Sequence, residues 1–219
     1  MGSACAQDNF NKLLNGCPIL EDLQTRIYYT EEQGEGVRLN TLSKLMRANI
    51  STIDVPIKAI HNVHFLQLKM LGMPLEPKIN SYYSDFLLLE SLVQLELRFY
   101  NMQYHWDDVV NVLLNCTKLQ ILSITQWSDL NNQDLYRNWR NRNIVPKCIS
   151  SQLRSCTLNF EGLTDEIQFA TYILMNAPLL RVMKITIAES SCPCWNALKE
   201  LKSSCPRISP KCQLSIIFT

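Results

Sequence analysis

Two cysteines separated by a single proline, Cys192 and Cys194, are the clearest candidates for chemistry in this sequence. Thiolates held this close together can bind zinc or exchange with a disulfide. A tetrahedral zinc site needs four ligands, however, and no partner pair of cysteines or histidines stands at a matching spacing. We therefore interpret both residues as loop cysteines and predict no metal site.

The three histidines, His61, His64 and His105, could act as general bases for a cysteine nucleophile. No cysteine, however, lies in a sequence pattern typical of catalytic cysteines. The acidic pair Asp107–Asp108 is explained structurally, because carboxylates favour the positive end of a helix dipole. The 6 glycines are not spaced as in nucleotide-binding loops. We predict no catalytic residue, no cofactor and no enzymatic activity, and a cysteine-dependent enzyme is the least favoured alternative.

Charge and hydropathy argue against several classes of partner. Lys and Arg number 21 against 20 for Asp and Glu, so no overall charge attracts nucleic acid or an anionic membrane. The longest apolar stretch, 86–99, is interrupted by charged residues and is shorter than the ~20 residues of a membrane span. The sequence begins without a signal-peptide pattern, and most of the nine cysteines lie in apolar contexts that suit reduced thiols. We expect an intracellular protein, cytoplasmic or nuclear, without nucleic-acid or membrane partners.

The elements that position these side chains are set by a short frame, leucine-x-x-leucine-x-leucine, that recurs about eight times. Its clear copies begin at Leu92, Leu119 and Leu180, and each alternates apolar and polar positions as a strand does. The copies begin 21 to 34 residues apart, so the array is irregular. Weaker copies begin at Leu20, Leu42, Val63, Leu153 and Lys211.

Between these copies the apolar residues adopt helical spacing, which predicts helices over 107–114 and over 164–176, the second capped by Thr164. One strand and one helix cannot bury their own apolar sides, but stacked copies form a continuous core. The sequence therefore predicts an α/β fold: an irregular leucine-rich-repeat solenoid, shaped as a curved slab with a parallel sheet on one face and helices on the other.

A polar and aromatic segment, 127–143, interrupts the repeat and is our predicted domain boundary, between residues 1–141 and 142–219. Its arginines Arg137, Arg140 and Arg142 alternate with aromatic residues, a composition that can bind nucleic acid. We favour a loop anchored by its aromatic side chains. No polar cap precedes the first copy, so we expect that an N-terminal part is missing and that Leu13, Leu14 and Ile19 are partly exposed.

The last third of the sequence contains five motifs: Val145–Leu153, Asn159–Gly162, Glu166–Phe169, Tyr172–Ala177 and Cys205–Cys212. From Val145 onward they resemble the FBD domain, the C-terminal module of plant F-box/FBD/leucine-rich-repeat proteins. The repeat segment 13–23 is similar to the repeat unit of the same proteins. The resemblance implies that an FBD module continues the slab at its end.

The F-box that ordinarily opens such proteins does not occur in this sequence. In the family the F-box contacts the adaptor of a cullin-type ubiquitin ligase, and the repeats are thought to select the target protein. The resemblance thus implies a non-catalytic protein-binding module, the substrate-recognition part of an F-box-type receptor, with an unidentified protein target. Binding to the ligase adaptor is not expected without an F-box. The alternative is an F-box-less binding or decoy protein with no ligase connection.

If the frame leucines point inward, the residues between them line the opposite face of the sheet. This face is polar and mildly basic, which suits an acidic peptide or a small anion bound across several strands. An ordinary solvated sheet face is the competing interpretation. The predicted partner-binding residues are Arg26, Gln67, Lys69, Glu96, Arg98, Ser123, Thr125 and Lys184.

Overall fold

A computed structural model of the chain describes residues 3–25, 39–51, 55, 57–71, 89–100, 106–127, 144–188, 195–203 and 205–219. Several residues singled out in the sequence lie outside these ranges: Arg26, His105, Cys192, Cys194 and the greater part of the boundary segment 127–143.

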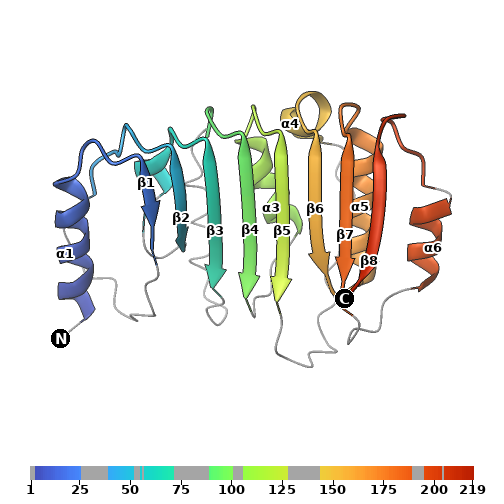
Figure 1. The fold of residues 1–219 in the computed structure, drawn as a ribbon, viewed down its shortest axis with the longest axis horizontal. Helices are drawn as coiled ribbons and strands as arrows, with labels where there is room; N and C mark the ends of the chain where they lie inside the picture. Colours follow the sequence, from blue (N-terminus) through green and yellow to red (C-terminus); the bar gives the residue numbers. More distant parts are fainter. Residues whose placement is uncertain are drawn as a thin grey trace.

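Parallel strands in sequence order form a single sheet across the described part of the chain. Each strand pairs with the next one along the chain, and all of them point in one direction (Figure 1). This order requires each connection to return to the same edge of the sheet, as stacked repeat units do. The eight strands are β1 (Asp22–Gln24), β2 (Arg47–Ser51), β3 (Phe65–Leu71), β4 (Gln94–Tyr100), β5 (Ile121–Trp127), β6 (Ser155–Phe160), β7 (Val182–Ile187) and β8 (Gln213–Phe218).

Helices form a second layer behind part of the sheet. Figure 1 shows α3 and α5 behind the sheet, α1 beside β1 at one end, and α6 beyond β8 at the other. Helix α4 contacts both α3 and α5, and α5 contacts α6. The helices are α1 (Ser3–Asn15), the 3₁₀ helix η1 (Ile57–Ile60), α3 (Trp106–Leu114), α4 (Lys147–Ser151), α5 (Thr164–Asn176) and α6 (Trp195–Ser203).

The core lies between the sheet and these helices. Alternate residues of each strand point into it, and the parallel register stacks them in rows from strand to strand. Each fully buried leucine or isoleucine contributes about 1.5–3 kcal/mol relative to an exposed one. One row contains Leu66, Leu95, Leu122, Cys156 and Met183, and the next contains Leu68, Leu97, Ile124, Leu158 and Ile185, all of them buried.

A ladder of backbone hydrogen bonds joins the starts of the strands. The carbonyl of Gln120, just before β5, accepts the amides of Arg154 at 2.8 Å and Ser155 at 3.1 Å. The carbonyl of Arg154 likewise accepts the amides of Arg181 at 2.8 Å and Val182 at 3.2 Å. The amino ends of neighbouring strands are therefore fixed at one level. We call this edge, made of the turns that lead into the strands, the amino rim; it is the upper edge in Figure 1.

The expected architecture agrees with the structure: an α/β slab with an open parallel sheet on one side and helices on the other. The strands, however, begin later than the frame does. Leu92, Leu119 and Leu180 each lie two residues before their strand, in a tight turn from which they enter the core. For example, the Leu119 amide bonds back to the carbonyl of Cys116 at 3.2 Å. The first leucine of the frame thus closes a turn rather than opening a strand.

Two smaller expectations are corrected. Leu13 and Ile19 are exposed as expected, but Leu14 is buried, because α1 packs it into the core. Thr164 is the first residue of α5 rather than its cap. The capping contact comes instead from Glu166, whose Oε2 accepts the backbone amides of Gly162 and Leu163, each at 2.8 Å.

Candidate functional site

The predicted partner-binding residues come together on the face of the sheet opposite the core, which we call the strand face. The register aligns Gln67, Glu96, Ser123, Thr157 and Lys184 in one row across five strands. A second row, two residues further along each strand, contains Lys69, Arg98, Thr125, Asn159 and Thr186. Seven of the eight predicted residues therefore share one face of the sheet, although Gln67 is only 8% exposed there, and Arg26 lies outside the described residues.

Arg98 is the centre of a polar cluster on this face. Its Nε donates to Glu96 Oε1 at 2.7 Å, and its Nη2 lies 2.6 Å from the same oxygen. In the amide orientation that satisfies its neighbours, the Gln67 side-chain oxygen lies 2.8 Å from Arg98 Nε and its nitrogen faces Asn49. Glu96 and Gln67 thus hold the guanidinium in place, and the Glu96 carboxylate offsets its charge.

This cluster changes the expected electrostatics of the strand face. The sequence suggests a mildly basic surface, but the Arg98 charge is balanced by Glu96. Lys69 is half-buried and Lys184 is exposed, and neither has an ion pair with any described residue. Toward β6 the face becomes neutral, where Asn159 Nδ2 donates to Thr125 Oγ1 at 3.0 Å. Among the described residues of the strand face, the positive charge without a neighbouring carboxylate is therefore confined to Lys69 on β3 and Lys184 on β7, and it does not form a continuous basic strip.

Apolar residues of the strand face were missed in the sequence. Ile121 and Val182 occupy the same row near the starts of their strands, and Ile217 lies beside Thr186. Their side chains are 38%, 44% and 37% exposed. Extending the strand alternation one step toward the start of each strand would have found Ile121 and Val182. Single exposed aliphatic side chains are common on protein surfaces, so these residues add apolar area to the strand face without defining a site by themselves.

The described cysteines are poorly suited to act as nucleophiles, the role considered from the sequence. Burial raises the pKa of Cys148 to about 12 and also raises the pKa values of Cys116 and Cys156. Burial likewise raises the pKa of Cys205 and of Cys212. These five thiols stay protonated at neutral pH, whereas a cysteine nucleophile needs the thiolate.

Within the described ranges, no group of three or more His, Cys, Asp and Glu side chains is arranged to hold a metal ion. Cys192, Cys194 and His105 are outside those ranges. None of the described helices has the length and apolar character needed to cross a bilayer.

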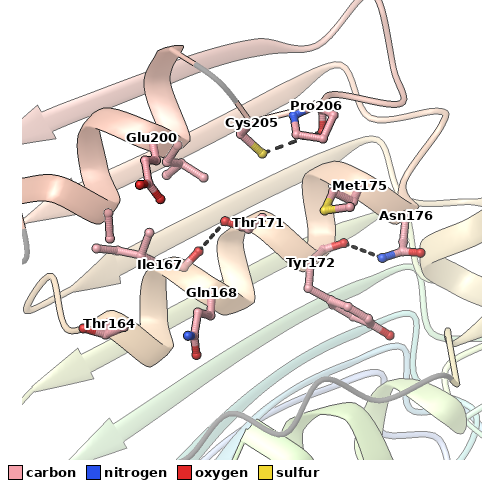
Figure 2. Close-up of a pocket in the computed structure, with 12 residues that line it drawn as sticks. Thr164, Ile167, Gln168, Thr171, Tyr172, Met175, Asn176, Glu200, Cys205 and Pro206 are labelled. Carbon is pink, nitrogen blue, oxygen red and sulfur yellow. Dashed lines mark hydrogen bonds between the residues drawn. The ribbon is translucent and has the colours of Figure 1, made fainter.

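A groove of about 770 Å³ lies between α5 and α6 (Figure 2). Its polar groups are largely used within the protein: Thr171 donates to the Ile167 carbonyl at 2.9 Å, and Asn176 donates to the Tyr172 carbonyl at 2.8 Å. The groove therefore offers few convergent polar groups to orient a small ligand. The strand face is the better candidate site.

Comparison with known proteins places these surfaces in a family context. Residues 141–185 match the FBD family, a segment that contains α4, β6 and α5. A putative F-box/FBD/LRR-repeat protein of Arabidopsis thaliana is 25% identical over 97% of this chain and 59% of its own length. An FBD-associated F-box protein of the same plant is 24% identical, covering 82% of this chain and 52% of the relative.

A further F-box/FBD/LRR-repeat protein of Arabidopsis thaliana is 31% identical over 76% of this chain and 39% of the relative. The chain thus spans between about two fifths and three fifths of the length of these relatives. No solved structure matches it. The FBD resemblance read from the sequence is confirmed by these matches.

Proposed function

This chain is related to the plant F-box/FBD/LRR-repeat proteins, and we propose that it is a leucine-rich-repeat slab that binds another protein and catalyses no reaction itself. The register of the sheet is the observation that carries this proposal. It holds Gln67, Glu96, Ser123 and Lys184 in one row on a rigid scaffold. Side chains on regular strands are better ordered than side chains on loops, which lowers the entropy cost of binding.

The repeat assignment and the domain division are part of the proposal. The recurring leucine frame and the names of the relatives support a leucine-rich-repeat region over 1–141. We assign 142–219 to an FBD module that extends the same slab, which the pairing of β5 with β6 supports.

The relatives also suggest a biological setting. We assign the strand face to recognition of a protein substrate for an F-box-type ubiquitin ligase, in the cytoplasm or the nucleus, with catalysis carried out by the partners. The residues of this chain are not expected to contact the ligase adaptor, because we recognise no F-box among them.

The experiment that tests this proposal is comparative affinity capture from plant extract, with bound proteins quantified by mass spectrometry. The tagged chain is compared with Ser123→Arg, which places a long side chain at the centre of the strand face. Ser123 is half-buried between Glu96 and Thr157 in its row, so the new side chain must project over the face. We expect at least a tenfold loss of the specific target, because a bulky charge at the centre of an interface prevents close packing.

Lys58→Arg serves as the matched control, because Lys58 is an exposed residue of η1 rather than of the strand face. Circular dichroism of all three proteins verifies folding. If Ser123→Arg retains the target as well as Lys58→Arg does, the strand face is not the binding surface. If the unmodified chain brings ligase subunits together with the target, recruitment does not depend on an F-box, and the expectation that this chain does not contact the ligase adaptor is wrong.

A further inference from the structure

The amino rim carries an uninterrupted series of cations along the second half of the sheet. One cation lies in or beside each turn that leads into β5, β6, β7 and β8: Lys118, Arg154, Arg181 and Lys211, respectively. All four residues are exposed. Within the part of the chain that the structure describes, none of them forms an ion pair and no acidic residue occupies these four turns.

The first half of the rim differs in charge. The turns that lead into β1 and β4 contain the exposed acids Glu21 and Glu90, and those that lead into β2 and β3 contain Lys44 and His64. Mixed charges cancel locally, whereas the second half has only one sign. A chain of net charge +1 therefore concentrates positive charge on one edge of its C-terminal half.

The backbone fixes the spacing of the two arginines and of the strand starts beside which the two lysines lie. The Arg181 amide bonds to the Arg154 carbonyl, and the Gln213 amide bonds to the Arg181 carbonyl, each at 2.8 Å. Adjacent strands lie ~4.8 Å apart, so four successive strand starts span about 14 Å. The four residues thus follow one edge of the sheet, with Arg154 and Arg181 directly before their strands, Lys211 two residues before β8 and Lys118 three residues before β5.

We propose that this cationic rim binds an extended, Asp/Glu-rich segment of a partner protein. Carboxylates along an extended chain can reach several cations of the rim, and an extended segment of four or five residues covers about 14 Å. A bilayer surface would require cations spread over a plane. A single-stranded nucleic acid would require aromatic side chains for base stacking, and no aromatic residue occupies these four turns.

Rim binding is independent of binding at the strand face. The rim residues precede the strands, whereas the strand-face residues lie within the strands. The test is fluorescence anisotropy of the full chain with fluorescein-labelled oligoglutamate peptides of two to eight residues. We expect the affinity to rise with peptide length and to level off at about five residues, where the peptide spans the four strand starts. We also expect the affinity to fall steeply between 50 mM and 300 mM NaCl, as screening weakens exposed charges.

The double variant Arg154→Glu/Arg181→Glu should bind the pentaglutamate peptide at least tenfold more weakly. The neutral variant Arg154→Gln/Arg181→Gln avoids new repulsion. Its affinity for pentaglutamate should lie between that of the Arg154→Glu/Arg181→Glu variant and that of the unmodified chain. Lys199→Glu/Lys202→Glu is the matched control: it reverses two exposed charges on α6 and leaves the rim intact. We expect this control to retain binding within about threefold.

Three results would overturn the proposal. Equal loss in the rim variant and the α6 control would show that net charge alone drives binding. Affinity that keeps rising up to eight residues would contradict a site four strands wide. Stronger rim-dependent binding of a dT8 oligonucleotide, or of vesicles with 30% phosphatidylserine, would assign the rim to a different class of partner. Loss of strand-face binding in Ser123→Arg leaves the rim measurements unaffected, so the two proposals fail separately.

Discussion

Trp106 links two neighbouring units through a buried hydrogen bond. Its Nε1 donates to Asp165 Oδ2 at 2.8 Å, and its ring stacks on Phe169 with the ring centres 4.3 Å apart. Trp106→Phe keeps most of the apolar ring but removes the donor from a buried carboxylate. We expect the free energy of unfolding to fall by about 2–4 kcal/mol, because the loss of the donor and a partly filled cavity act together. Urea denaturation followed by circular dichroism measures the change.

Trp195→Phe is the matched control for this prediction. Trp195 is 56% exposed, although its ring stacks on Phe218 at 5.4 Å. Exposed substitutions of this kind usually change stability by no more than about 0.5 kcal/mol. Equal effects of the two substitutions would contradict the role assigned to the buried hydrogen bond.

The residues of the strand face illustrate what strand alternation predicts and what it leaves out. Alternation was sufficient to place Gln67, Lys69, Ser123 and Lys184 on one surface, because side chains in a strand change face at every step. It did not reveal the pairing of Arg98 with Glu96, which depends on side-chain conformation. Composition therefore suggested a basic face where the structure has a locally neutral cluster.

At the scale of elements, α1 shows how the first unit is closed. Leu14 is 4% exposed and belongs to the core, whereas its neighbour Leu13 is 63% exposed. Leu14→Ala should therefore lower the free energy of unfolding by about 2–4 kcal/mol, and Leu13→Ala should change it by less than about 0.5 kcal/mol. Thermal and urea denaturation of the two variants provide the comparison. Equal small effects would mean that α1 is not docked on the sheet in solution.

Elements with a repeated apolar pattern were predictable, and those without one were not. The helix over 164–176 was predicted at its observed bounds, because its buried apolar residues recur at helical spacing, although Thr164 opens the helix and does not cap it. Helix α4 has five residues, too few to display helical periodicity, and α6 buries only Leu198 and Leu201. The predicted strand starts were two residues too early, because the first leucine of the frame lies in a turn. Periodicity alone does not distinguish a turn leucine from a strand leucine.

At the scale of the whole molecule, contacts cross the proposed boundary between 141 and 142. Strand β5 pairs with β6 over five residues, from Ile121–Ser155 to Thr125–Asn159. The Cys148 thiol donates to the carbonyl of Leu113 at 3.3 Å, and Trp106 reaches Asp165. Division of the sequence into a repeat region and an FBD module therefore does not divide the core.

We accordingly expect the whole chain to unfold in one cooperative transition. In a repeat array, cooperativity depends on the interfaces between neighbouring units, and the β5–β6 interface is built like the others. Urea transitions recorded by circular dichroism at 222 nm and by tryptophan fluorescence should have the same midpoint. Residues 142–219 expressed alone should lack a cooperative transition, because Phe160 and Phe169 would lose the Trp106 ring that covers them. Two separate midpoints, or a stably folded 142–219 fragment, would show that the FBD segment is an autonomous domain attached to the repeats.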